Sequence, residues 1–111
     1  MAERTIKVVM NGVTGRMGYR QHLLRSILAI RDAGGVVAGG DRIQVAPVLV
    51  GRNADKLAEL AKQHDVADWT TDLDAALADP DAQIYFDAQV TAARNAAILS
   101  ALAAGQHILT E

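Results

Sequence analysis

Three glycines have a spacing that can bind a phosphate group. Gly12, Gly15 and Gly18 follow a short apolar run and precede a run with helical hydrophobic spacing. In a strand–turn–helix unit, the first glycine lets the chain leave the strand sharply, the second lets backbone N–H groups approach phosphate oxygens, and the third lets the helix pack closely. The helix N-terminus adds unpaired N–H groups and a partial positive charge. The pattern therefore predicts a turn that binds the pyrophosphate of a dinucleotide, with a turn needed only for packing as the alternative.

A second group of polar residues lies where the second predicted strand ends. Dinucleotide-binding domains that use NAD carry an acidic residue there, which binds the adenosine ribose. This sequence has Gly51-Arg52-Asn53 instead, and Lys56 follows one helical turn later. Arginine binds a 2′-phosphate through a forked, charge-assisted pair, whereas a carboxylate would repel it. We therefore predict NADP as the preferred cofactor and NAD as the alternative, unless Arg52 and Lys56 are only a solvated helix start.

A third candidate, Asp87, ends the fourth predicted strand at the same edge as the glycine turn. The loop after it should border the nicotinamide side of the crevice. Asp87 is therefore a ribose contact, a group that polarises a neighbour, or the cap of a turn. No histidine and carboxylate have metal-ligand spacing. The sequence has no cysteine, which excludes disulfides, thiolate catalysis and cysteine-ligated metals.

The elements that must position these residues alternate along the chain. The sequence predicts strands at residues 6–10, 43–50, 69–70, 84–86 and 107–110. It predicts helices from about residue 17 to a stop at Gly34-Gly35, and at about 53–64, 72–78 and 92–104. Pro47 removes a donor, so residues 48–50 are the safer part of the second strand. Residues 33–42 are predicted to be a flexible connection. Because crossovers between parallel strands are right-handed, the alternation predicts an α/β fold: a Rossmann-type, doubly wound parallel sheet in three α/β/α layers.

Composition limits the class of protein. The 111 residues fit one domain, spanning 1–111. Half of the residues are hydrophobic and 4% are aromatic, which suits parallel strands covered by close-packed helices. The net charge of -2 gives no attraction to nucleic acid or an anionic membrane, and no stretch is long enough to span a bilayer. We therefore expect a cytoplasmic protein with no nucleic-acid or membrane partner.

With these residues placed, the chain resembles the N-terminal domain of the glucose–fructose oxidoreductase and inositol dehydrogenase (Gfo/Idh/MocA) family. The resemblance runs from Ile6 to Glu111 and is most specific in Ala-Gly-Gln-His-Ile-Leu-Thr-Glu, residues 104–111. This stretch is similar to the family's Ala-Gly-Lys-His-Val, two residues, then Glu-Lys-Pro, and Glu111 matches the glutamate. The resemblance implies hydride transfer between a sugar or polyol carbon and a nicotinamide, with a C-terminal domain that supplies most of the substrate pocket.

The resemblance also implies roles for single residues. The glycine turn would bind the pyrophosphate. The positions that match the family's turn are Gly12, Gly15, Arg16, Met17 and Gly18, and Thr14 lies within the same turn. Arg52 would meet the adenosine ribose or its phosphate. Asp87, Thr91 and Glu111 would lie toward the nicotinamide ribose. The family's catalytic lysine would follow Glu111, so we expect these 111 residues to bind the cofactor without turnover.

The sequence also departs from the family. Family members often carry Pro-Asn and then His after the fourth strand, where this chain has Val90-Thr91 and Arg94. The turn Asn-Gly-Val-Thr-Gly-Arg-Met-Gly is also similar to that of dihydrodipicolinate reductases. Two alternatives to a sugar dehydrogenase therefore stay open: a reductase domain of that kind and a non-enzymatic NADP sensor. We also expect a homo-oligomer, because the 107–110 strand would form an unpaired edge.

Overall fold

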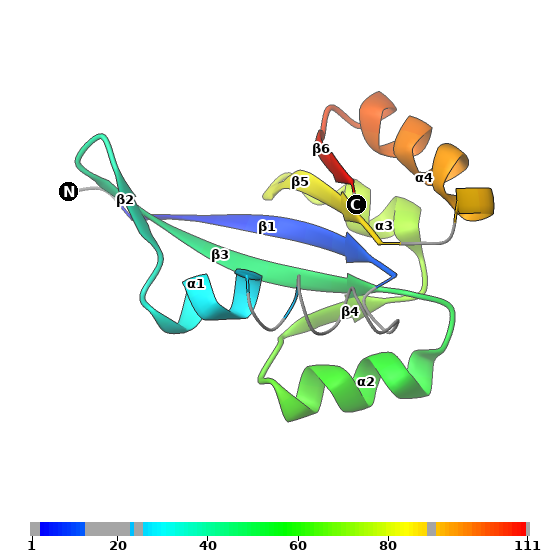
Figure 1. Ribbon diagram of the computed structural model, residues 1–111, viewed down its shortest axis with the longest axis horizontal. Helices are drawn as coiled ribbons and strands as arrows, with labels where there is room; N and C mark the ends of the chain where they lie inside the picture. The colour runs from blue at the N-terminus through cyan, green and yellow to red at the C-terminus, as the bar shows by residue number, and fades with distance from the viewer. Residues whose placement is uncertain (1–2, 13–22, 24–25, 89–90, 111) are drawn as a thin grey trace.

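One mixed, largely parallel sheet lies at the centre of the molecule (Figure 1). The computed structural model describes residues 3–12, 23, 26–88 and 91–110, without the side chains of residues 91–93. Within these residues the strands are β1 (Glu3–Asn11), β2 (Val36–Ala38), β3 (Asp41–Val50), β4 (Asp68–Thr70), β5 (Ala82–Asp87) and β6 (His107–Thr110). Their order is β2-β3-β1-β5-β6, and β4 also pairs with β3. Every pair is parallel except the antiparallel β2–β3 pair, so the predicted Rossmann-type fold is confirmed.

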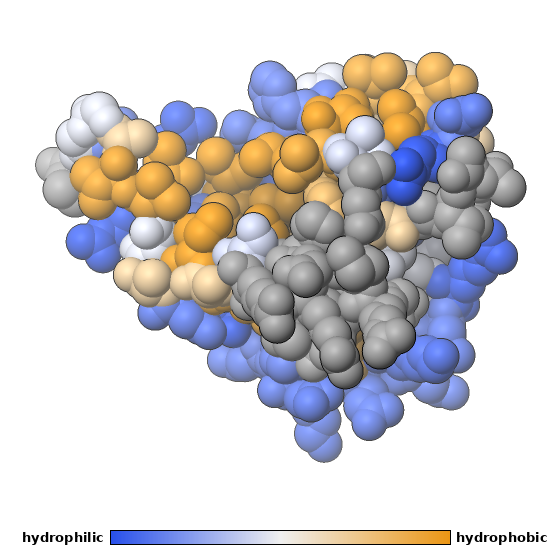
Figure 2. Space-filling model, in the orientation of Figure 1, coloured by the Kyte–Doolittle hydropathy of each residue, from blue (hydrophilic) through white to orange (hydrophobic). Residues whose placement is uncertain are grey.

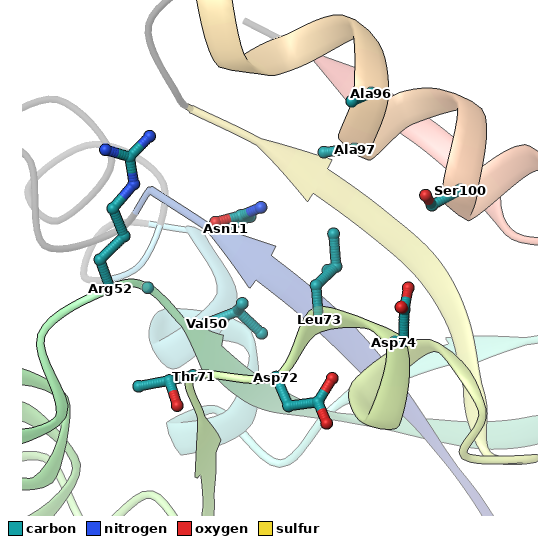
Figure 3. Close-up of a pocket in the computed structure, with 11 residues that line it drawn as sticks. Asn11, Val50, Arg52, Thr71, Asp72, Leu73, Asp74, Ala96, Ala97 and Ser100 are labelled. Atoms are coloured by element: carbon teal, nitrogen blue, oxygen red, sulfur yellow. The ribbon is translucent and has the colours of Figure 1, made fainter.

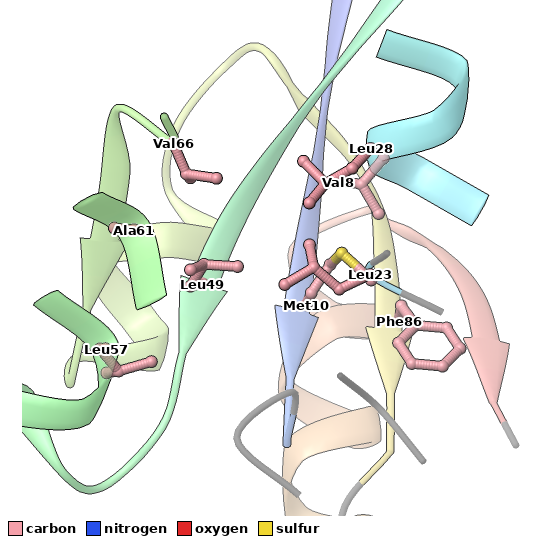
Figure 4. Packing of buried hydrophobic residues seen from close by; sticks show 9 residues of the cluster. All are labelled: Val8, Met10, Leu23, Leu28, Leu49, Leu57, Ala61, Val66 and Phe86. Carbon is pink, nitrogen blue, oxygen red and sulfur yellow. The ribbon is translucent and has the colours of Figure 1, made fainter. Parts of the chain in front are cut away.

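Helices cover both faces of the sheet. The described helices are α1 (Leu28–Asp32), α2 (Ala54–Gln63), α3 (Leu73–Leu77) and α4 (Thr91–Ala103). Leu28 of α1 and Leu57 of α2 pack in one apolar cluster with Met10 and Leu49 of the strands (Figure 4). Residues of α3 and α4 pack in a second cluster around Val9. Successive strand residues point to opposite faces, so the two clusters form the predicted three layers.

The strand order reverses beside β1. The chain runs from β1 outward to β3 and β4, and then returns to place β5 and β6 on the other side of β1. Parallel strands end at the same edge, and Asn11 is in register with Val50 of β3 and with Asp87 of β5. Ligands of open α/β sheets bind at the carboxyl edge where the order reverses. The fold therefore brings the ends of β1, β3 and β5 together at such a place.

The prediction of a flexible connection over residues 33–42 is wrong. This segment contains β2 and a tight hairpin into β3, through Gly39 and Gly40. Both glycines have positive φ, 58° and 84°, which a two-residue hairpin turn of this twist requires and which other residues rarely adopt. The sheet is therefore not purely parallel.

Pro47 lies inside β3 without breaking it. The Val50 carbonyl accepts the Gly12 N–H on the β1 side, so the alternation along the strand turns the Pro47 nitrogen away from β1. On that other side, pairing with β2 ends at Ile43 and pairing with β4 begins at Val48. The missing N–H donor therefore faces a stretch of β3 that has no neighbouring strand among the described residues.

Two of the predicted helix starts are confirmed by their caps. The Asn53 carbonyl Oδ1 accepts the Lys56 N–H at 3.1 Å, and Asp72 Oδ1 accepts the Ala75 N–H at 3.2 Å. The first predicted helix falls largely on residues 13–22 and 24–25, outside the described residues, and its described part ends at Asp32, just before the Gly34-Gly35 pair that was predicted to stop it. None of the described helices has the length and apolar character needed to cross a membrane.

Candidate functional site

The end of β1 turns as the first glycine of the motif predicts. Gly12 has a φ of 87°, which favours glycine, while its N–H still donates to the Val50 carbonyl at 3.3 Å. The Asn11 carbonyl accepts the Ala88 N–H at 2.9 Å, so β1 is tied to both neighbours at its last residues. The other predicted residues of the turn, and the last residue of the chain, lie outside the described residues: Thr14, Gly15, Arg16, Met17, Gly18 and Glu111.

A pocket of about 550 Å³ opens beside these strand ends (Figure 3). It lies between the carboxyl ends of β1 and β3, the start of α3 and the flank of α4. Its lining consists of Asn11, Val50, Gly51, Arg52, Thr71, Asp72, Leu73, Asp74, Ala96, Ala97 and Ser100. The pocket is thus built from four segments that the fold, and not the sequence order, brings together.

Two facing walls of the pocket each contain an apolar part. Leu73 projects from the start of α3 toward Asn11 and the facing helix, where Ala96 and Ala97 present only methyl groups (Figure 3). Small side chains on α4 leave room for a flat group between the two helices. Such a group would gain dispersion contacts and lose apolar surface to water, as an aromatic base does.

The polar groups of the pocket carry both signs of charge. Arg52 lies at the rim, directly after β3, and its side chain is exposed. Asp72 and Asp74 lie on the opposite wall, and Asp72 uses one oxygen to cap α3. A phosphate would be attracted to the Arg52 side, whereas donor groups such as hydroxyls would suit the aspartate side. The sequence did not predict these two aspartates as residues of the site.

The four residues predicted around the end of β3 divide into two groups. Gly51 and Arg52 line the pocket, whereas Asn53 and Lys56 begin α2 outside its lining. The Asn53 side chain is engaged in capping the helix, where it accepts the Lys56 N–H. A contact of Asn53 or Lys56 with a cofactor therefore stays a prediction, and their observed role is to start the helix.

A buried polar network lies directly behind the pocket. The Asp87 side chain is fully buried, at 0% exposure, and its Oδ2 accepts the Tyr85 hydroxyl at 2.6 Å. The same hydroxyl oxygen accepts the Asn11 Nδ2–H at 3.0 Å, and Arg94 Nε lies 3.4 Å from Asp87 Oδ1. Burial raises the pKa of Tyr85, and the hydrogen bond to Asp87 raises it further, so the phenol stays neutral.

Asp87 is not among the residues that line this pocket. Its carboxylate holds Tyr85 and Arg94 inside the protein. A contact between Asp87 and a ribose stays a prediction. Thr91 begins α4, and its side chain lies outside the described residues. No group of three or more metal-ligating side chains is present in the described parts of the chain.

Comparison with known proteins agrees with this architecture. The chain is 57% identical over 107 residues to a D-xylose dehydrogenase of Paenarthrobacter nicotinovorans. The matched region covers 96% of this chain and 28% of the relative. The chain thus spans less than a third of the length of this curated relative. No protein-family model matches the chain.

Solved structures share the fold at lower identity. A levoglucosan dehydrogenase in complex with NADH and levoglucosan matches with a TM-score of 0.74 and 22% identity, over 96% of this chain and 27% of that one. A scyllo-inositol dehydrogenase of Lactobacillus casei with bound NAD(H) and scyllo-inositol matches with a TM-score of 0.63 and 23% identity, over 96% and 27%. The curated relative is thus a sugar dehydrogenase, in agreement with the predicted resemblance, and the solved structures show that dehydrogenases with bound NADH or NAD(H) share this fold.

Proposed function

We propose that this chain is the nicotinamide-dinucleotide-binding domain of a dehydrogenase that acts on a sugar, a polyol or a related substrate. The observation that carries this proposal is the pocket at the carboxyl edge of the sheet, where the strand order reverses and where Arg52, Asn11 and two apolar walls converge. The similarity to a D-xylose dehydrogenase over 96% of the chain supports the substrate class.

The residues of the pocket fit the adenosine half of such a cofactor. The base would lie between Leu73 and the alanines of α4, and the ribose would lie near the ends of β1 and β3. The pyrophosphate would follow the turn that Gly12 begins. When bound, the nicotinamide supplies the hydride acceptor or donor. The chain's own residues bind and orient the other half of the molecule and exclude water from it.

The cofactor preference is the finer part of the proposal. Arg52 at the rim favours a 2′-phosphate and therefore NADP, because a guanidinium pairs with a phosphate dianion in a forked geometry. Asp72 and Asp74 on the opposite wall oppose a further negative charge. The dehydrogenases of similar fold named above hold NADH or NAD(H). We propose that the attraction between Arg52 and the 2′-phosphate outweighs the repulsion by Asp72 and Asp74, so that NADP is preferred over NAD.

A titration of the chain with NADPH and with NADH, followed by the fluorescence of the nicotinamide, tests both statements. Hydrogen bonds to charged groups contribute about 1.5–3 kcal/mol, so Arg52→Ala should weaken NADPH binding by roughly 10- to 150-fold and leave NADH binding nearly unchanged. Lys62→Ala is the matched control, since Lys62 is an exposed cation at the far end of α2. No binding of either dinucleotide would contradict the proposed function, and an unchanged NADPH affinity in Arg52→Ala would contradict the NADP preference alone.

The substrate pocket belongs, in this proposal, to a part of the protein outside these 111 residues. Hydride transfer needs a substrate held next to the nicotinamide and a group that gives or takes a proton. The chain should therefore bind the dinucleotide but oxidise neither D-xylose nor scyllo-inositol by itself. Turnover of a sugar or polyol by these residues alone would contradict this division of roles.

We also propose that the chain self-associates. Figure 2 shows hydrophobic residues gathered over the β2–β3 hairpin, and Val36 and Val37 of that hairpin are 46% and 60% exposed. Leu109 on β6 is 57% exposed. Exposed apolar groups of this size tend to associate. Sedimentation that shows only a monomer at high concentration would contradict this expectation.

A further inference from the structure

Asn11 is a buried polar side chain in the pocket to which the proposed function assigns no specific contact. It is 4% exposed, it is the last residue of β1, and it lines the pocket beside Val50. A buried amide needs hydrogen-bond partners for both of its ends, because an unmade bond costs the desolvation of that group. The partner of its nitrogen is Tyr85, as described above.

The direction of the hydrogen bonds fixes how Asn11 faces the pocket. The Tyr85 hydroxyl has one proton, and it donates that proton to Asp87 Oδ2 at 2.6 Å. The hydroxyl oxygen is then an acceptor for Asn11, so the amide must turn its NH₂ group toward Tyr85. The carbonyl Oδ1 of Asn11 must consequently point the other way. No hydrogen bond within the described residues reaches this oxygen.

The side toward which Oδ1 points is the Arg52 side. In Figure 3 the oxygen of Asn11 lies toward Arg52 and its nitrogen lies toward α4. Arg52 and the strand end of Val50 form the part of the pocket nearest the rim, whereas the apolar walls for a base lie further toward α4. A group that joins a base on one side to a phosphate on the other is a ribose, and its free hydroxyls are donors.

We propose that Asn11 is a specificity-determining residue, whose carbonyl oxygen accepts a hydrogen bond from a ribose hydroxyl of the adenosine half of the cofactor. Tyr85 is a positioning residue, because it holds the amide in the orientation that presents an acceptor. This inference rests on the proposed function, since it assumes that the pocket takes an adenosine. It names a contact that the glycine turn and Arg52 do not provide.

The inference is tested with three mononucleotides: AMP, 2′-deoxy-AMP and 3′-deoxy-AMP. Each is titrated into the chain in competition with NADH. A hydrogen bond between neutral groups contributes about 0.5–1.5 kcal/mol, so one of the deoxynucleotides should bind roughly 2- to 12-fold more weakly than AMP. The deoxynucleotide that loses affinity identifies the hydroxyl.

Two variants tie this discrimination to Asn11. In Asn11→Leu, AMP should bind as weakly as the discriminated deoxynucleotide, and in Tyr85→Phe the discrimination should shrink because the amide is free to turn. Gln83→Leu is the matched control, because it makes the same amide-to-apolar change on β5, next to the opposite edge of the sheet. The control should keep the full discrimination. A merely structural role of Asn11 would weaken all three nucleotides equally and leave their affinity ratios unchanged.

The outcomes separate the two proposals. If NADH itself does not bind, the proposed function fails. If NADH binds but AMP does not compete with it, only the role of Asn11 toward the adenosine is overturned. If AMP binds but the unmodified chain binds both deoxynucleotides equally well, only the role of Asn11 is overturned, whether or not the variants fold. Discrimination that persists in Asn11→Leu would overturn it as well.

Discussion

Asp79 and Asp87 lie at opposite ends of β5, and each is next to a cation, yet their surroundings differ. Asp79 precedes the strand at the amino edge, and its Oδ2 accepts a hydrogen bond from the Lys7 ammonium at 2.7 Å while its side chain remains 29% exposed. Asp87 ends the strand at the carboxyl edge, and it is fully buried between Tyr85 and Arg94. The same residue type thus forms a solvated pair at one edge and a buried network at the other.

This difference separates the amino edge, where the charges are solvated, from the carboxyl edge, where we propose the cofactor site. At the amino edge, Lys7 also lies 3.4 Å from Asp68, so the charges there neutralise one another near water. Such exposed ion pairs change the free energy of unfolding by little. At the carboxyl edge, the network runs from Asp87 through Tyr85 to Asn11, and Asn11 lines the pocket. Burying a polar network is costly unless each group is paired, so its position directly behind a pocket indicates that it serves the pocket.

The largest expected effect is on stability at Asp87. Asp87→Asn keeps the shape of the side chain but leaves Arg94 without its buried counter-charge, which should lower the free energy of unfolding by about 3–5 kcal/mol. Asp79→Asn at the other edge is the matched control and should cost less than about 1 kcal/mol. Urea unfolding of both variants measures the difference. Equal losses would show that the two edges do not differ as described.

A bulky residue on α4 should block the pocket without harming the fold. Ala96 is exposed and lines the pocket, so Ala96→Trp would fill the space between α4 and Leu73. Losing the burial of a ring-sized group costs about 1.5–3 kcal/mol, which is a roughly 10- to 150-fold weaker dinucleotide affinity. Ala103→Trp, at the end of the same helix, is the control. Affinity that is the same in both variants would place the nucleotide elsewhere.

Asn53 caps α2 at the carboxyl edge, and two variants separate this cap from the predicted cofactor contact. Asn53→Ala removes the cap of α2 and should cost about 1 kcal/mol of unfolding free energy, and its affinity for NADPH reports whether the side chain does more than cap the helix. Asn53→Ser retains a capping oxygen and should recover most of the loss. A clear drop in nucleotide affinity in Asn53→Ala, absent in Asn53→Ser, would instead indicate a direct contact with the cofactor.

The smallest effect is the pH dependence of the amino-edge pair. The hydrogen bond with Asp79 raises the pKa of Lys7, and the bond from Lys7 lowers the pKa of Asp79 below 3.8. The stabilisation that Lys7 gains is fully present below pH 10.5, and it is lost as the pH rises through its raised pKa. The stabilisation that Asp79 gains is present above pH 3.8, and it is lost as the pH falls through its lowered pKa.

Removing the pair should therefore matter only in the range between these limits. Lys7→Met should be less stable than the unchanged chain by under about 1 kcal/mol at neutral pH, and the gap should narrow below pH 4. Unfolding curves at pH 7 and pH 3 measure this gap. A gap that widens in acid would have the wrong sign for a pair in which the carboxylate must be ionised.

The layers of the fold could be predicted well from the sequence because the signals for its strands, turns and helix caps come from neighbouring residues. The turn at Gly12, the caps at Asn53 and Asp72, and the apolar strands each depend on residues that are close in sequence. The β2–β3 hairpin was missed although Gly39-Gly40 is a strong signal for a two-residue turn. The few β-branched residues on either side, Val36, Val37 and Ile43, were too short a run to suggest paired strands.

The site was predicted only where it follows directly from strand ends. Arg52 lines the pocket as the pattern after the second predicted strand suggests. The opposite wall, formed by Asp72, Leu73 and the alanines of α4, depends on how two distant helices approach each other, which no local pattern specifies. Asp87 was predicted to contact a ribose, to polarise a neighbour or to cap a turn, but its burial and its link through Tyr85 to Asn11 depend on the register of β1 and β5.

The most direct test of the account is to locate the bound dinucleotide by amide chemical-shift changes in an NADPH titration. The molecule has a second cavity of about 530 Å³ at the amino edge, lined by residues that include Asp79, Gln83 and His107. If the carboxyl-edge pocket binds the dinucleotide, saturable shifts are expected at Asn11, Arg52, Leu73, Ala97 and Ser100, with none at the residues of this second cavity. Shifts confined to the amino edge, or no shifts at saturating NADPH, would contradict the claim that the carboxyl-edge pocket binds the adenosine half of the cofactor.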